Sequence, residues 1–74
     1  MSVEFEYCTI NWIWSDSDIR VISPTGDGSS HKGGHQEITQ LLNTLGKEGW
    51  DVVACVAVSN WIYWTLKRSI QKKG

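Results

Sequence analysis

Residues 38–58 read ITQLLNTLGKEGWDVVACVAV, and this stretch decides the fold. Its first half repeats apolar residues at i, i+3, i+4 and i+7, which is the spacing of a helix with one apolar stripe. The four positions are Ile38, Leu41, Leu42 and Leu45. Gly49 supplies the residue with a left-handed backbone that commonly ends a helix. We therefore predict a helix that begins at about His35 or Gln36 and ends at Lys47.

The second half, WDVVACVAV at residues 50–58, is nearly continuous in apolar residues and rich in valine. Such a run is typical of a strand that is covered on both faces, so we expect it in the middle of a sheet. Ser59 and Asn60 form a two-residue polar break before WIYWTLKRS at residues 61–69. A break of this length between two strand patterns predicts a β-hairpin.

The chain before the helix contributes at least one further strand. Residues 3–14 are rich in aromatic and β-branched residues, lack Gly and Pro, and alternate between two faces. One face begins with charged residues and ends with Cys8, Ile10, Trp12 and Trp14. Residues 19–22 are compatible with a short strand that Pro24 would end. Residues 25–34 are rich in glycine and are predicted to form an exposed connection.

These elements predict one α+β domain over residues 1–74. Its antiparallel sheet has three to four strands with one helix packed on one face. The expected order is strand, optional short strand, helix, strand, strand. A flexible Gly-rich loop is expected at about 24–34 and a frayed C-terminus at about 70–74.

The sequence LLNTLGKEGWDVV at residues 41–53, followed by YWTLKR at residues 63–68, resembles the small family catalogued as domain of unknown function 4177. The pattern Leu-Asn-x-Leu-Gly-x-Glu-Gly-Trp-(Asp/Glu)-Val-Val is the most specific part of the resemblance. Phe5-Glu6-Tyr7 is also similar to the opening of that family. The resemblance leaves out the Gly-rich loop. It implies a small strand–helix–hairpin domain of unknown activity, and it brings no set of catalytic residues.

Composition and charge narrow the classes of function. Hydrophobic residues make up 41% of the chain and charged residues 20%, which is a globular composition. Eight acidic against seven basic residues give a net charge of −1, which argues against a nucleic-acid partner. We expect a cytoplasmic protein without a membrane span, because the sequence has neither a basic leader with an apolar run nor a stretch of about 18 apolar residues. Cys8 and Cys55 lie in strand patterns and fit packed, reduced thiols, with one disulfide between them as the alternative.

Self-association is the expected source of additional stability, because 74 residues form only a small core. One helix covers one sheet face, whereas five tryptophans exceed what a single thin core can hide. We predict a homodimer whose interface contains Trp12, Trp14 and Trp64, with Trp50 in the core beside the end of the helix. A monomer with an unusually aromatic core is the alternative. A different protein is the second class of partner.

The segment from Thr25 to His35 is the candidate for a ligand site. Its glycines would let backbone amides approach an anion, and His31, Lys32 and His35 are the side chains suited to bind a small ligand or anion. We expect no metal site, because two glycines interrupt the spacing of the two histidines and no third ligand has a fixed place. No cofactor is expected.

Catalytic residues are not predicted either. Nucleophilic chemistry would need Cys8 or Cys55 to be exposed beside a histidine, and both lie in strand patterns. Glu4 and Glu6 share a strand face, and antiparallel pairing of the first and last strands would bring them near Arg68 and Lys67 as register-keeping pairs. The predicted function is therefore a homo-oligomeric protein-interaction module without catalytic activity. The alternative is a small-ligand or anion-binding protein that uses residues 25–35.

Overall fold

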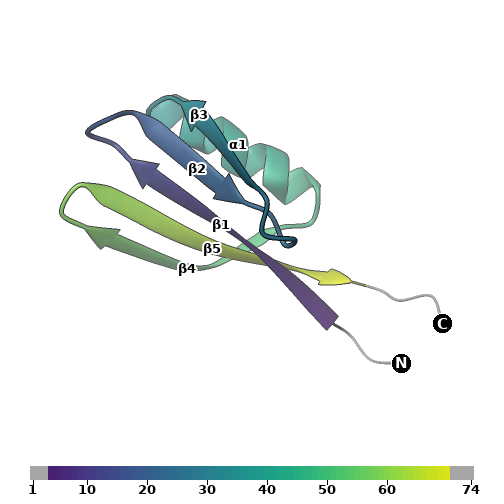
Figure 1. Cartoon of the computed structure of the whole chain (residues 1–74). Helices are drawn as coiled ribbons and strands as arrows, with labels where there is room; N and C mark the ends of the chain where they lie inside the picture. Colours follow the sequence, from purple (N-terminus) through teal and green to yellow (C-terminus); the bar gives the residue numbers. More distant parts are fainter. Residues whose placement is uncertain (1–3, 71–74) are drawn as a thin grey trace.

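A five-stranded antiparallel sheet carries one helix on one of its faces in the computed structural model, which describes residues 4–70 (Figure 1). The strands are β1 (Glu4–Ile13), β2 (Asp18–Ile22), β3 (Gly28–Lys32), β4 (Asp51–Val58) and β5 (Trp61–Ile70), and the helix is α1 (His35–Lys47). The strands lie side by side in the order β3-β2-β1-β5-β4. The α+β class and the antiparallel sheet are confirmed, whereas the number of strands is five rather than three to four.

Helix α1 has the predicted bounds, and its apolar stripe faces the sheet. Ile38 is buried, and three leucines pack partly buried against the same core, namely Leu41, Leu42 and Leu45. Gly49 has a φ of 95°, a left-handed conformation that glycine adopts at low cost. The predicted end of the helix is therefore confirmed in its backbone geometry.

The two additional strands lie on the outer side of β1. β2 pairs with residues 9–13 of β1, and β3 pairs with β2 from Asp18↔Lys32 to Ile22↔Gly28. The prediction that residues 24–34 form a loop is therefore wrong for Gly28–Lys32, although every residue of β3 is exposed. The sequence of β3 is GSSHK, which contains no apolar residue. Its strand structure comes from pairing with β2 rather than from a pattern of its own.

Strand β4 lies at the edge of the sheet, so the prediction that it is central is wrong. β5 pairs with β1 along its whole length, from Glu4↔Ile70 to Ile13↔Trp61, and thereby separates β4 from β1. The hairpin between β4 and β5 is confirmed, with Val58 opposite Trp61 on either side of the two-residue break. Within the described residues, β4 thus has one edge paired with β5 and one edge without a strand partner.

The core lies between α1 and the strands β2, β1 and β5. The buried side chains are Cys8, Ile10, Trp12, Ile19, Ile38, Trp50 and Leu66. The even-numbered residues of the middle of β1 therefore face the helix, and we call the opposite side of the sheet the open face. No helix within residues 4–70 is long and apolar enough to cross a membrane. The frayed C-terminus was expected at about residues 70–74. Ile70 is the last residue of β5, and residues 71–74 lie outside the described residues.

Candidate interaction surface

Strand β4 exposes apolar side chains on both of its faces. Directly opposed residues share a face of the sheet, so Val52 is on the helix side with its buried partner Leu66. Val56 lies opposite Tyr63 on the open face, and Val58 follows two residues later on the same side. These three valines are 45–54% exposed, and every residue of β4 is exposed. We use the name β4 surface for Val52, Val53, Val56, Val58 and Tyr63.

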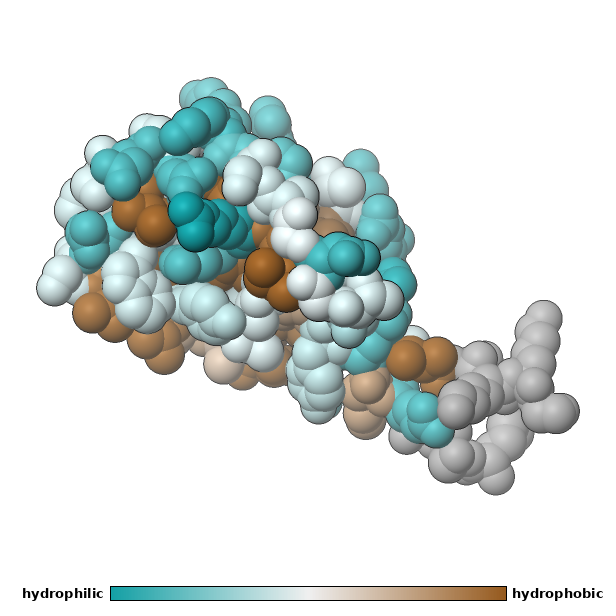
Figure 2. Space-filling model, viewed as in Figure 1, coloured by the Kyte–Doolittle hydropathy of each residue, from teal (hydrophilic) through white to brown (hydrophobic). Residues whose placement is uncertain are grey.

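The helix leaves β4 uncovered because it lies over the other half of the sheet. In Figure 1, α1 runs behind β2 and β3, whereas β4 forms the opposite border. Figure 2 shows hydrophobic groups along the rim of the molecule that β4 occupies in Figure 1. A strand with one solvated face normally alternates apolar and polar residues, and the sequence DVVACVAV does not alternate. The composition of β4 thus suits burial on both faces, whereas in the single chain neither face of the strand is covered.

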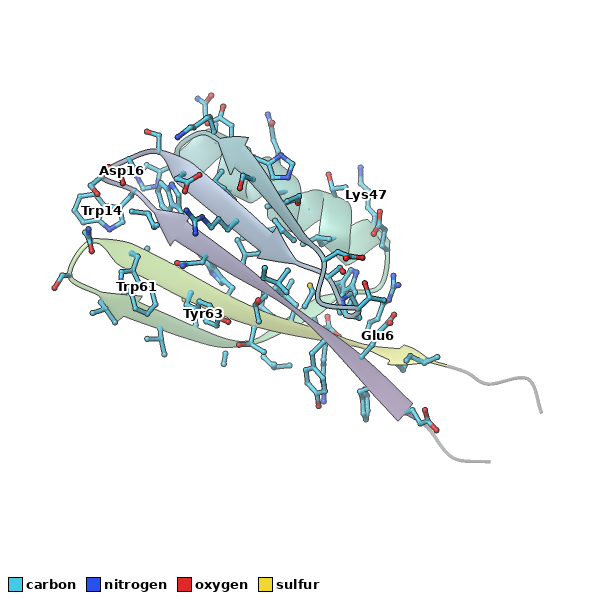
Figure 3. All side chains as sticks on the ribbon, in the orientation of Figure 1. Glu6, Trp14, Asp16, Lys47, Trp61 and Tyr63 are labelled. Atoms are coloured by element: carbon cyan, nitrogen blue, oxygen red, sulfur yellow. The ribbon has the colours of Figure 1, made fainter. Side chains whose placement is uncertain are left out.

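The open face extends this apolar surface across β5 onto β1. Trp61 and Tyr63 project from the same side of β5, with their rings edge to face and the centroids 6.1 Å apart (Figure 3). Phe5 and Tyr7 continue the surface along β1 and are 47% and 52% exposed. Lys67 interrupts it, because its Nζ lies 4.3 Å from the centroid of the Phe5 ring. The open face next to β4 is therefore free of charge only at the hairpin end, where Val56 and Val58 lie opposite Tyr63 and Trp61.

Two of the three tryptophans predicted for the interface lie on the helix side of the sheet. Trp12 is 5% exposed, and its indole Nε1–H donates to the carbonyl oxygen of Gly33 at 3.2 Å. Its ring stacks on that of Trp64, which packs partly buried against the core. The expectation that Trp12 belongs to an uncovered face is therefore wrong. On the open face of the middle of β1, the neighbouring residues Thr9 and Asn11 are polar, so in this part of the strand the helix covers the more apolar side.

Trp14, the third of these residues, lies beyond the end of β1 and is 49% exposed (Figure 3). It lines a hollow of about 350 Å³ together with Trp12, Gly34, His35 and Ile62. Among the described residues of this lining, His35 is the only titratable side chain, and its ring meets that of Trp12 edge to face with a centroid distance of 5.0 Å. The hollow is aromatic, and it lacks the several convergent polar groups that a specific ligand site requires.

The three residues predicted for ligand binding do not converge on one site. His31 and Lys32 belong to β3 and line a depression against Glu37 and Gln40 of the helix. His35 begins α1 and lines the separate hollow beside Trp14. Within residues 4–70, no group of three His, Cys, Asp or Glu side chains is placed to hold a metal ion. One small ligand therefore has no common pocket in which to contact all three predicted residues.

The backbone amides at the start of α1 already have an anionic acceptor. The N–H of Gly34 donates to Oε1 of Glu37 at 2.8 Å. This hydrogen bond, together with one from the backbone N–H of Glu37 itself, holds the pKa of the Glu37 carboxyl below its ordinary value. A bound anion at this end of the helix would have to compete with a carboxylate of the chain.

The two thiols are free and lie in different environments. Cys8 is buried, and this burial raises the pKa of its thiol, which keeps the group protonated and poorly nucleophilic. Cys55 is exposed on β4, opposite Trp64. The prediction of packed thiols is thus confirmed for Cys8 and wrong for Cys55, because β4 is an edge strand rather than a central one.

The predicted cross-strand charge pair is confirmed for Glu6 and Arg68. These residues lie directly opposite each other, and Nε of Arg68 donates to the Glu6 carboxylate. Arg68 also donates to the carbonyl oxygen of Glu48 at 3.1 Å, and its guanidinium carbon lies 4.5 Å from the centroid of the Trp50 ring. Trp50 is 6% exposed, as predicted for a core residue beside the helix end. This cluster fastens the end of the helix to the sheet.

Comparisons with protein families, with curated proteins and with solved structures find no match. The resemblance to domain of unknown function 4177 therefore stays a prediction. No residue of the β4 surface was predicted from the sequence to belong to an interface. The sequence signal for this surface is the apolar run at residues 50–58. The run indicates a strand that is covered on both faces, but it does not identify the segment or partner that covers it.

Proposed function

We propose that this domain is a non-catalytic protein-interaction module that associates with a second copy of itself through the β4 surface. The observation that carries the proposal is the exposure of DVVACVAV on both faces of the sheet. Complete burial of a valine side chain is worth about 1.5–3 kcal/mol, so four valines that are about half exposed favour a cover. A second copy presents the same surface, and a two-fold pairing covers both at once.

The state of the titratable groups supports a role in binding rather than in catalysis. The Cys8 thiol is buried, the Glu6 carboxylate accepts from Arg68, and the Glu37 carboxylate accepts from Gly34. Each of these groups has a structural partner or a dry environment, and an active site would instead need them exposed and convergent.

The ligand-binding alternative has less support, because its three residues line different depressions. The double variant His31→Ala/Lys32→Ala separates the two functions. Both side chains lie on β3, at the border of the sheet farthest from β4. We expect this variant to associate as the wild type does.

Unfolding at several protein concentrations tests the proposal. If only the folded chain associates, mass action makes the urea midpoint rise over a concentration range of about a hundredfold. We expect this rise in the wild type and in His31→Ala/Lys32→Ala. A midpoint that stays constant in the wild type over the whole range would show that the chain folds as a monomer and would contradict the proposal.

A further inference from the structure

We infer that the second copy joins through the outer edge of β4, which pairs antiparallel with β4 of the partner and makes one continuous sheet. This inference rests on the proposed function and specifies how the β4 surface is used. The joined sheet has the strand order β3-β2-β1-β5-β4-β4-β5-β1-β2-β3. Both helices then lie on the same side of it, because the two-fold axis is perpendicular to the sheet.

The two edges of the sheet differ in their protection against such pairing. β3 is five residues long, polar throughout, and ends in Lys32. β4 is eight residues long, contains no proline or lysine, and has a single charged residue, Asp51, at its start. Short and charged edge strands discourage pairing with another chain, whereas long apolar ones promote it. The register shift in β4 lies between Val52 and Ala54, so residues 54–58 form a regular edge.

β4 is also complementary to itself. Antiparallel pairing about the two-fold axis places open-face residues, such as Val56 and Val58, beside open-face residues of the partner strand, and it places helix-side residues, such as Cys55 and Ala57, beside helix-side residues. The two copies of Asp51 lie at opposite ends of the pair, so no like charges meet. Among the described strands, β4 is the only one that bears apolar residues on both faces without a charge beyond its first position. A second β4 is therefore a complementary strand that this chain itself supplies, and its side chains pack beside those of the first β4 on each face.

The charges of the open face favour edge pairing over a face-to-face sandwich. Arg20 and Lys67 project from the open face, opposite Asn11 and Tyr7 respectively. The side chain of Arg20 is 60% exposed. Packing two open faces together would take these cations out of water, which costs free energy that edge pairing avoids.

Symmetry restricts the register of the pair. A two-fold axis perpendicular to the sheet places one residue of β4 directly opposite its own counterpart. Among the regular residues 54–58, only Ala54, Cys55 and Val56 can be central in a register that pairs at least five of the eight residues of β4. The Cα atoms of opposed residues in antiparallel strands are about 4.5–5.5 Å apart, which falls within the range of about 4.4–6.8 Å that a disulfide spans. A cysteine at the central position should therefore form a disulfide with its own counterpart.

A cysteine scan tests the pairing. It uses the wild-type chain, with Cys55, and the variants Ala54→Cys and Val56→Cys, each combined with Cys55→Ala. Under mild oxidation we expect one of these proteins to form the covalent dimer about tenfold faster than the others. The control is Thr65→Cys with Cys55→Ala, which places the thiol on the open face of the interior strand β5. Fast cross-linking at residue 65, or none at the three β4 positions, would overturn edge pairing.

Amide hydrogen exchange gives a second measurement that needs no substitution. Alternate amides of an edge strand point away from the sheet and exchange rapidly unless another strand pairs with them. We expect these β4 amides to slow as the protein concentration rises, while the corresponding amides of β3 stay fast. If the urea midpoint rises with concentration but the β4 amides stay fast, the chain associates through another surface and edge pairing is wrong. If the midpoint does not rise either, the proposed self-association fails as well.

Discussion

Trp12 stacks on Trp64 on the helix side of the sheet, with the two ring centroids 6.5 Å apart and the ring planes inclined by 23°. The rings come from the adjacent strands β1 and β5, and Trp12 is held further by its hydrogen bond to Gly33. The stacked pair therefore stabilises the single chain. The valines of β4, rather than these tryptophans, form the surface that we propose for association.

Trp12→Ala is expected to lower the free energy of unfolding by about 3–5 kcal/mol, because it empties a buried site and removes a hydrogen bond. Trp14→Ala is the matched control. Because the Trp14 ring is 49% exposed, its removal should lower the free energy of unfolding by about 1 kcal/mol or less. Urea unfolding of both variants at one fixed protein concentration compares the two losses. Equal losses would contradict the assignment of Trp12 to the core.

Gly33→Ala is expected to destabilise the fold by about 1–3 kcal/mol, because the added methyl group overpacks the start of the helix. A Cβ at this position would lie 2.4 Å from Cγ and 2.5 Å from Cβ of Glu37. The Cβ of Glu37 is fixed to the helix backbone and cannot move aside freely. At Gly34 the nearest atom is Oε1 of Glu37, at 4.0 Å, so Gly34→Ala should stay within about 0.5 kcal/mol of the wild type. Thermal or urea unfolding distinguishes the two, and a harmless Gly33→Ala would show that the helix start is positioned differently.

Glu37→Gln is expected to reduce the dependence of stability on acidic pH. Hydrogen bonds from the backbone N–H groups of Gly34 and Glu37 hold the pKa of this carboxyl below its ordinary value of 4.5. A lowered folded-state pKa gives stabilisation that is complete above the unfolded-state value and is lost as the pH falls through the folded-state value. The difference in unfolding free energy between wild type and Glu37→Gln should therefore shrink as the pH is lowered from neutral to well below 4.5. A difference that does not change with pH would contradict this role of the carboxylate.

The elements with local signals were predictable from the sequence. The i, i+3, i+4, i+7 spacing located α1, Gly49 marked its end, and the pair Ser59 and Asn60 located the hairpin. The pairing of Glu6 with Arg68 followed from placing the first strand antiparallel to the last. In each case the prediction depends on residues that are near one another in the chain, or on the pairing of two strands.

The order of the strands in the sheet was not predictable in the same way, because it depends on contacts between distant segments. The polar sequence of β3 carries no strand signal, and its pairing with β2 arises only once β2 presents an edge. The apolar run of β4 correctly indicates a strand that suits burial on both faces, but it does not say whether the cover comes from this chain or from another. The side of β1 that faces the helix was not predicted, because both sides mix apolar and polar residues: Phe5 and Tyr7 lie on the open face with Thr9 and Asn11, whereas Glu6 lies on the helix side with Cys8 and Ile10.

The molar mass of the chain in solution, measured by light scattering after size exclusion, tests the association through β4 most directly. The wild type should have about twice the chain mass of 8.4 kDa at micromolar concentration. Val56→Lys should raise the dimer dissociation constant about tenfold or more, because each copy would place a cation at the apolar edge. Ser30→Lys, at an exposed position on the other edge strand, should keep the wild-type mass. A folded wild-type chain that remains at 8.4 kDa at every concentration would contradict the association, as would a Val56→Lys variant that dimerises as tightly as the wild type.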